Sequence, residues 1–189
     1  TVALFAYAAY SAYQWWRNSQ ATEASKLYET MVAAITKGDK DQTLRAANDL
    51  QKAGGQASAI AIDVGKPESI AAAFAQVERD HGRCDMLVNS AGIAKVFPFI
   101  DFPLDNFLAT MNVNVTGTLL CSQAAARLMM KQGWGRIVNI ASVAGMRAVG
   151  SGRTAYGTSK GAVIALTRQM AVEHADYGIT ANAVAPGPV

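Results

Sequence analysis

Tyr156 and Lys160 stand four residues apart, so on a helix both side chains leave the same face. A phenol, with a pKa of roughly 10, is a poor acid or base near neutral pH. A neighbouring ammonium group stabilises the phenolate and draws that pKa toward the working range, which lets a tyrosine exchange a proton with a substrate. Tyrosine and lysine also occur at this spacing on many exposed helices, so the pair needs support from its surroundings.

Ser142 supplies part of that support. It follows the segment 136–141, Arg-Ile-Val-Asn-Ile-Ala, which predicts a strand, and it precedes Tyr156 by fourteen residues. Ligands of open α/β sheets bind at the carboxyl ends of the strands, so a hydroxyl there could polarise a substrate carbonyl. A serine at this position could equally cap a helix or close a turn.

Short apolar segments alternate with helical patterns along most of the chain. The predicted strands are 57–62, 86–89, 136–141 and 180–184, and the helices between them are 67–81, 104–131 and 154–177. Apolar strands separated by helices predict a parallel sheet covered on both faces. Two further helices are predicted upstream, at 21–37 and at 40–53.

Five motifs stand in one order along this alternating region. They are Asn89-Ser-Ala-Gly92, Asn112-Val-Asn-Val-Thr-Gly117, Gly135-Arg-Ile-Val-Asn-Ile-Ala-Ser142, Tyr156-Gly-Thr-Ser-Lys160 and Asn182-Ala-Val-Ala-Pro-Gly187. In this order they resemble short-chain dehydrogenases/reductases. The resemblance implies an α/β fold with a Rossmann-type, doubly wound parallel sheet. It also implies hydride transfer between NAD or NADP and a small alcohol or carbonyl substrate, in a cytoplasmic homo-oligomer paired through its long helices.

The resemblance assigns roles residue by residue. Tyr156 resembles the general acid/base, Lys160 the residue that lowers the tyrosine pKa and holds the nicotinamide ribose, and Ser142 the hydroxyl that orients the carbonyl. Asn114 resembles the residue that holds a water in the proton relay. The expected cofactor contacts are Asp63, Val64, Asn89, Ala91, Gly92, Tyr156, Lys160, Pro186, Gly187 and Val189. Asp63 and Val64 match the adenine contact, although an aspartate also commonly ends a strand.

Part of the family pattern has no counterpart. The family opens with a strand and a Thr-Gly-x-x-x-Gly-x-Gly loop that cradles the pyrophosphate. When residues 2–5 are laid on that strand, Tyr7, Ser11 and Tyr13 fall where the glycines belong. The first two strands and the last strand are not recognisable. The sequence therefore predicts an incomplete sheet, preceded by N-terminal helices. This sheet is expected either to be of low stability or to have an altered arrangement, in which the N-terminal helices cover the gap or the strand at 57–62 pairs differently.

Residues 1–41 resemble the anchor and first helix of the tetratricopeptide-like accessory protein of the bacterial Sec translocon. Residues 2–16 carry no charge and end in Trp15-Trp16 before Arg17, a pattern typical of a membrane interface. The run is shorter than the roughly 20 residues of a bilayer crossing. Membrane attachment through 2–16, a buried or oligomerising helix, and a strand-plus-helix start all stay open. The predicted domains are a helical segment, 1–41, and a partial dehydrogenase domain, 42–189.

Composition narrows the function classes. The net charge is +3 and the sequence has no dense cluster of basic residues, which argues against nucleic-acid binding. Cys84 and Cys121 lie in unrelated segments without ligand spacing, so no metal site is predicted. The alternative to an oxidoreductase is a non-catalytic, membrane-anchored or interaction protein that keeps a truncated dehydrogenase fold.

Overall fold

The computed structural model describes residues 30–35 and 56–187, which fall into two compact units divided between Ala61 and Ile62. In the first unit, strands β1 (Thr30–Ile35) and β2 (Gln56–Ala61) pair in parallel. Their register sets Thr30 opposite Gln56 and Ile35 opposite Ala61. The strand predicted at 57–62 is confirmed to within one residue.

The helix predicted over 21–37 is wrong where it meets β1. Thr30–Ile35 is an apolar run with three β-branched residues, and a run this short fits either a strand or one side of a helix. The choice depends on pairing with β2, more than twenty residues further along the chain, which local periodicity does not reveal. The helix predicted at 40–53, the rest of 21–37 and the segment 2–16 lie outside the described residues.

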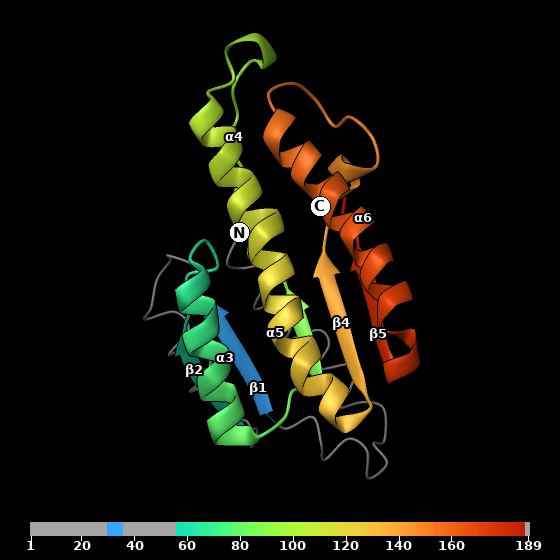
Figure 1. Cartoon of the computed structure of the whole chain (residues 1–189). Helices are drawn as coiled ribbons and strands as arrows, with labels where there is room; N and C mark the ends of the chain where they lie inside the picture. Colours follow the sequence, from blue (N-terminus) through green and yellow to red (C-terminus); the bar gives the residue numbers. More distant parts are fainter. Residues whose placement is uncertain (1–29, 36–55, 188–189) are drawn as a thin grey trace. The chain divides into compact units, whose positions relative to one another are not determined.

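The second unit is built on three parallel strands in the order β3 (Met86–Asn89), β4 (Gly135–Ile140) and β5 (Ile179–Val184). Helix α3 (Pro67–His81) precedes β3, and α6 (Thr154–Glu173) joins β4 to β5. Figure 1 shows α5 (Gly117–Gln132) beside α6 in front of the strands. These strands and helices agree with the predicted alternation.

The helical region predicted at 104–131 is confirmed, with an irregularity at its middle. Helix α4 (Leu104–Met111) passes into a π turn, η3 (Asn112–Thr116), and continues as α5 (Figure 1). The predicted helix at 154–177 ends earlier, at Glu173. A 3-10 turn, Ala175–Tyr177, follows it and closes at Gly178, whose φ of 69° is left-handed.

Helices α5 and α6 cover one face of this sheet. Met129 from α5 and Met170 from α6 pack in one cluster with Ile137 of β4 and Ile179 of β5. On the opposite face of β3, Met86 and Val88 are 49% and 47% exposed. Along β3 the more exposed side chains therefore alternate with the more covered ones.

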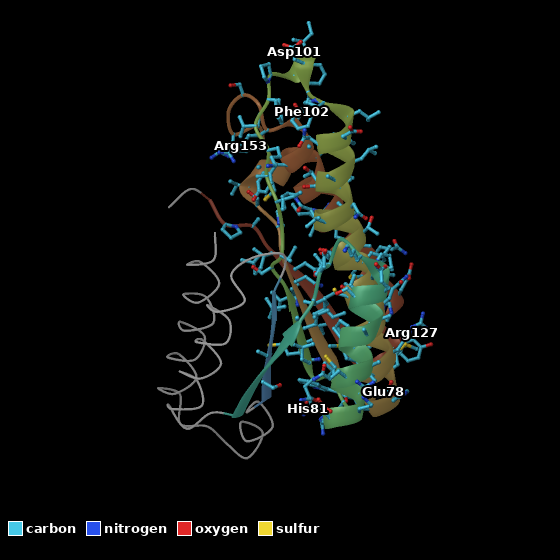
Figure 2. All side chains as sticks on the ribbon, turned by 90° about the vertical axis from the view of Figure 1, so that its left-hand side faces the viewer. Glu78, His81, Asp101, Phe102, Arg127 and Arg153 are labelled. Carbon is cyan, nitrogen blue, oxygen red and sulfur yellow. The ribbon has the colours of Figure 1, made fainter. Side chains whose placement is uncertain are left out.

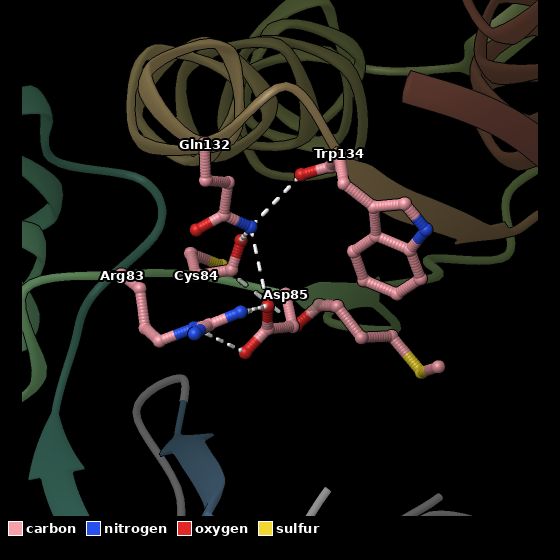
Figure 3. Close-up of polar contacts among 6 residues, drawn as sticks. Arg83, Cys84, Asp85, Gln132 and Trp134 are labelled. Atoms are coloured by element: carbon pink, nitrogen blue, oxygen red, sulfur yellow. Dashed lines mark hydrogen bonds and ion pairs between the residues drawn. The ribbon is translucent and has the colours of Figure 1, made fainter. Parts of the chain in front are cut away.

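A polar cluster fixes the amino-terminal end of the sheet (Figure 3). The Gln132 side-chain amide, at the end of α5, donates to the carbonyl oxygens of Cys84 and Trp134 at 2.9 and 2.8 Å. It also lies 3.2 Å from a carboxylate oxygen of Asp85, which pairs with Arg83. One side chain thus joins α5 to the residues that lead into β3 and β4.

We expect Gln132→Ala to lower the free energy of unfolding by about 1–3 kcal/mol, because both carbonyl groups lose their amide donor. Gln123→Ala removes an exposed glutamine from the same helix and should change stability by less than about 0.5 kcal/mol. Chemical denaturation of the two variants measures the difference. Equal stability of both variants would show that the cluster contributes nothing.

Candidate active site

Ser142 begins a turn immediately beyond β4. Its backbone is extended, and its Oγ accepts a hydrogen bond of 3.1 Å from the Ala144 amide, which opens the 3-10 turn Val143–Gly145. Ser142 therefore does cap a turn, one of the two readings that the sequence left open. Because its oxygen accepts this bond, the hydroxyl proton can still be donated to another group.

This turn rests directly on α6 because glycines stand at the contact. A Cβ at Gly145 would lie 2.5 Å from the Lys160 carbonyl carbon, and one at Gly157 would lie 3.0 Å from the Ala144 oxygen. Gly161 faces Gly145 in the same way, at 3.3 Å. Sequence reasoning missed these glycines as site residues. Their spacing of four on α6, with Tyr156 and Lys160 beside them, was the available signal.

Lys160 is buried, with 5% of its surface exposed. Its Nζ donates to the Ile140 carbonyl oxygen at 2.6 Å and lies 5.6 Å from the centre of the Tyr156 ring. Burial lowers the pKa of this amine from 10.5 to about 8, because water no longer solvates the charged form. The lysine therefore lies beside the tyrosine, as the sequence predicted, and is held by the last residue of β4.

Asn114, in the π turn, is fully buried and fixes the loop that follows β3. Its amide oxygen accepts from the Ile93 amide at 2.8 Å, and its Nδ2 donates to the Ile93 carbonyl oxygen at 3.0 Å. Nδ2 also donates to Ser159 Oγ at 2.9 Å, and that hydroxyl donates to the Tyr156 carbonyl oxygen at 2.8 Å. Its backbone oxygen accepts from Thr118. Ser159 was missed by sequence reasoning.

Gly92 lies close to both Asn114 and Lys160. A Cβ on Gly92 would lie 3.2 Å from Asn114 Oδ1 and 3.6 Å from Lys160 Nζ. A side chain at this position would therefore stand against both Asn114 and Lys160.

The Asn89 side chain forms hydrogen bonds with α5 and β4. Its Nδ2 donates to Ser122 Oγ at 2.9 Å and to Asn139 Oδ1 at 2.8 Å, and Asn139 donates in turn to Thr167. The side chain ties β3 to β4 and α5, so a cofactor contact at this position would fall to its backbone.

Asp63 and Val64 lie near the start of the second unit, which begins at Ile62. One carboxylate oxygen of Asp63 accepts from the Gly65 amide at 3.0 Å, as in a turn that ends a strand. The Gly65 carbonyl in turn accepts from the Asn112 side chain at 2.8 Å. Val64 is buried, and a Cβ on Gly117 would lie 2.7 Å from its carbonyl oxygen. The pair is thus anchored to the π turn that carries Asn114.

The segment after β5 returns to the serine turn. The Pro186 carbonyl oxygen accepts from the Val143 amide at 3.1 Å, and Gly187 faces the Val143 side chain. Val189 lies outside the described residues. A pocket of about 320 Å³ opens beside this region, between Phe99 and the loop that joins Ser142 to Tyr156. It is lined by Phe99, Ala144, Ala148, Val149, Gly150, Ser151, Gly152, Arg153, Thr154 and Gly157.

Figure 2 shows Arg153 and Phe102 toward one end of the unit, and Glu78, His81 and Arg127 toward the other. The site lies with the former, at the carboxyl ends of β3, β4 and β5. Among residues 30–35 and 56–187, no group of acidic, histidine or cysteine side chains could hold a metal ion. No helix in that part of the chain is long and apolar enough to cross a membrane.

A family model described as short chain dehydrogenase matches residues 22–189. The match includes β1 and begins well inside the segment 1–41.

Individual proteins similar to this chain agree with the family match. The chain is 37% identical over 172 residues to the short-chain reductase protein NovJ of Streptomyces niveus, covering 90% of this chain and 65% of that protein. A crystal structure of a gluconate 5-dehydrogenase from Burkholderia cenocepacia J2315, in complex with NADP and tartrate, superposes with a TM-score of 0.76 at 36% identity. An NAD+-bound xylitol dehydrogenase gives 0.77 at 37% identity. Both superpositions cover 82% of this chain and 60% of the other, which confirms the Rossmann-type fold. The chain spans less than two thirds of each relative's length.

We expect Gly145→Ala to lower the free energy of unfolding by about 1–3 kcal/mol, because its Cβ would meet the α6 backbone, which cannot move aside easily. At Gly65 a Cβ would meet the Asp63 carboxylate at 3.2 Å, and that side chain can rotate away. Gly65→Ala should therefore cost less than Gly145→Ala in a thermal denaturation series. The reverse order would contradict the proposed tight contact.

The buried amine of Lys160 should make stability depend on alkaline pH. Its folded pKa, about 8, lies below the unfolded 10.5, so burying the charged form costs stability that is recovered as pH rises between these values. Relative to Lys160→Met, the wild-type chain should gain on the order of 3 kcal/mol from pH 7 to pH 10.5. Urea unfolding of both chains at several pH values measures this gain. A constant difference would exclude the lowered pKa.

Proposed function

Because this chain belongs to the short-chain dehydrogenase/reductase family, we propose that the protein is an NAD(P)-dependent oxidoreductase that acts on an alcohol or carbonyl substrate. One observation carries the proposal. A buried lysine, the adjacent tyrosine and a serine hydroxyl lie at the carboxyl edge of a parallel sheet, held together by glycine-mediated contact of turn and helix. That edge is where open α/β sheets bind their ligands.

In this proposal Tyr156 transfers the proton. During reduction its phenol gives a proton to the carbonyl oxygen, and during oxidation the phenolate takes it back from the alcohol. The Lys160 ammonium favours the charge that develops on the phenol oxygen. Ser142, whose proton is free to be donated, orients the substrate oxygen. Since the Asn114 side chain bonds to Ile93 and Ser159, a relay water would be held through the Asn114 backbone oxygen, which also accepts from Thr118 Oγ1 at 2.8 Å.

The arrangement fits a nicotinamide dinucleotide, which supplies or receives the hydride. The observation that favours this fit is the lack of a side chain at Gly92, where a Cβ would lie 3.6 Å from Lys160 Nζ. Lys160 and the backbone of 89–92 would hold the ribose side, and Pro186 and Gly187 would line the nicotinamide pocket. Asp63, whose second carboxylate oxygen is not used in its turn, and Val64 would contact the adenine. The solved relatives hold NADP in one case and NAD+ in the other, so both coenzymes remain candidates.

The remaining predictions concern the rest of the protein. Three of them stay predictions: pairing between copies through the long helices near 104–131 and 154–177, the division into 1–41 and 42–189, and membrane contact through 2–16. Co-sedimentation with lipid vesicles tests the membrane contact. A chain that stays in the supernatant at every lipid concentration would exclude it.

The cofactor proposal is tested by titrating NADH and NADPH against the purified chain and following their fluorescence. We expect saturable enhancement with at least one of them, because the ribose side of the site is present. Absence of any change at millimolar concentration would favour the non-catalytic alternative for this chain.

Tyr156→Phe should lower turnover by about 10²–10⁴-fold while cofactor binding persists, because only the transferable proton is removed. Tyr177→Phe is the matched control, since Tyr177 is exposed beyond the end of α6, and it should keep full activity. Steady-state kinetics with a panel of small alcohols and ketones compares them. Unchanged turnover in Tyr156→Phe would refute the proton transfer assigned to this residue.

A further inference from the structure

Ser159 lies between the catalytic elements and has no part in the mechanism described so far. It is fully buried, one residue before Lys160. Its hydroxyl accepts from Asn114 Nδ2 at 2.9 Å and donates to the Tyr156 carbonyl oxygen at 2.8 Å. We propose that Ser159 is a positioning residue, which fixes the Asn114 amide and thereby locks the Ile93 loop against the turn of α6 that carries Tyr156 and Lys160.

Asn114 needs this partner because its amide can face Ile93 in only one way. Its oxygen accepts from the Ile93 N–H and its nitrogen donates to the Ile93 carbonyl, so exchanging the two atoms would break both bonds. The second proton of Nδ2 points to Ser159. With no hydroxyl there, a fully buried donor would lose its partner, and such donors are costly to leave unpaired. Ser159 therefore stabilises the one orientation that holds the loop.

The bond from Ser159 to the helix backbone does not by itself distinguish it. Thr158 makes the same kind of bond, from its Oγ1 to the Thr154 carbonyl oxygen at 2.8 Å, but its side chain is exposed and has no further partner among the described residues. What sets Ser159 apart is the bond to Asn114, 45 residues away in sequence, on the π turn. It connects two elements that Thr158 does not.

The loop that this chain of bonds holds lies in front of the lysine. A Cβ on Gly92, the residue before Ile93, would fall 3.6 Å from Lys160 Nζ. The two hydrogen bonds between the Asn114 side chain and the Ile93 backbone act as a clamp on this loop. If this clamp loosens, the loop moves and water reaches the Lys160 amine. The catalytic consequence of Ser159 rests on the proposed function, whereas its effect on the loop does not.

Hydrogen exchange of the Ile93 amide tests the clamp without any need for turnover. We expect Ser159→Ala to speed exchange at Ile93 by roughly tenfold, the effect of one hydrogen bond, and Thr158→Ala to change it less than about twofold. The proposal is overturned if Ile93 stays protected in Ser159→Ala, or if Thr158→Ala exposes it equally. Either result is independent of whether the chain is an active oxidoreductase.

Ser159→Cys provides a second variant in case Ser159→Ala fails to fold. A thiol takes the place of the hydroxyl with a somewhat larger atom, and it is a weak hydrogen-bond donor and acceptor. We expect faster Ile93 exchange here too, with the alkaline limb of the kcat/KM pH profile displaced upward as Lys160 becomes hydrated. A serine that only fills space would leave both the exchange rate and the pH profile of Ser159→Cys unchanged, and that outcome would overturn the proposal.

Discussion

The contact between the Val143–Gly145 turn and α6 is the constraint on which the site depends. Two backbone segments meet here at distances that leave no room for a Cβ at Gly145. Ser142 is fixed by the turn, and Tyr156 and Lys160 are fixed by the helix. Only so close an approach of the two backbones brings Ser142 at the strand end close to Tyr156 and Lys160 on the helix.

Hydrogen bonds among buried polar side chains hold most of the other residues of the site in place. Burying these polar groups costs stability. Lys160 is kept in a place where its charge is poorly solvated, held by a single carbonyl of β4. Asn114, Ser159 and Asn139 are likewise fully buried, and each finds partners on other elements. Such networks favour one arrangement because any other leaves a donor or acceptor unpaired. Burying the charged Lys160 lowers the stability of the folded protein. Such a cost is typical of residues that are kept for function and not for folding.

The sequence predicted the described part of the second unit well because its signals are local. Pro67 at a helix start, the apolar run before Ser142, and the four-residue spacing of Tyr156 and Lys160 each depend on near neighbours. The failures depend on distant partners. Strand β1 is defined by pairing with β2, whose first residue lies more than twenty residues further along the chain. Ser159 looks like an ordinary helix serine until the position of Asn114 is known. The donors of Asn89 likewise turn toward the sheet, which no motif could show.

The π turn at Asn112–Thr116 limits how the gene for this protein can change. A π turn holds one residue more than an α-helical turn of similar height, and each residue turns a helix by about 100°. Deleting one residue there would restore a regular helix but rotate α4 relative to α5. Either Asn114 would leave Ile93, or the outer face of α4 with Leu104 and Leu108 would turn inward. A change of length at the π turn would therefore be selected against, because it alters the orientation of a whole helix and not one side chain.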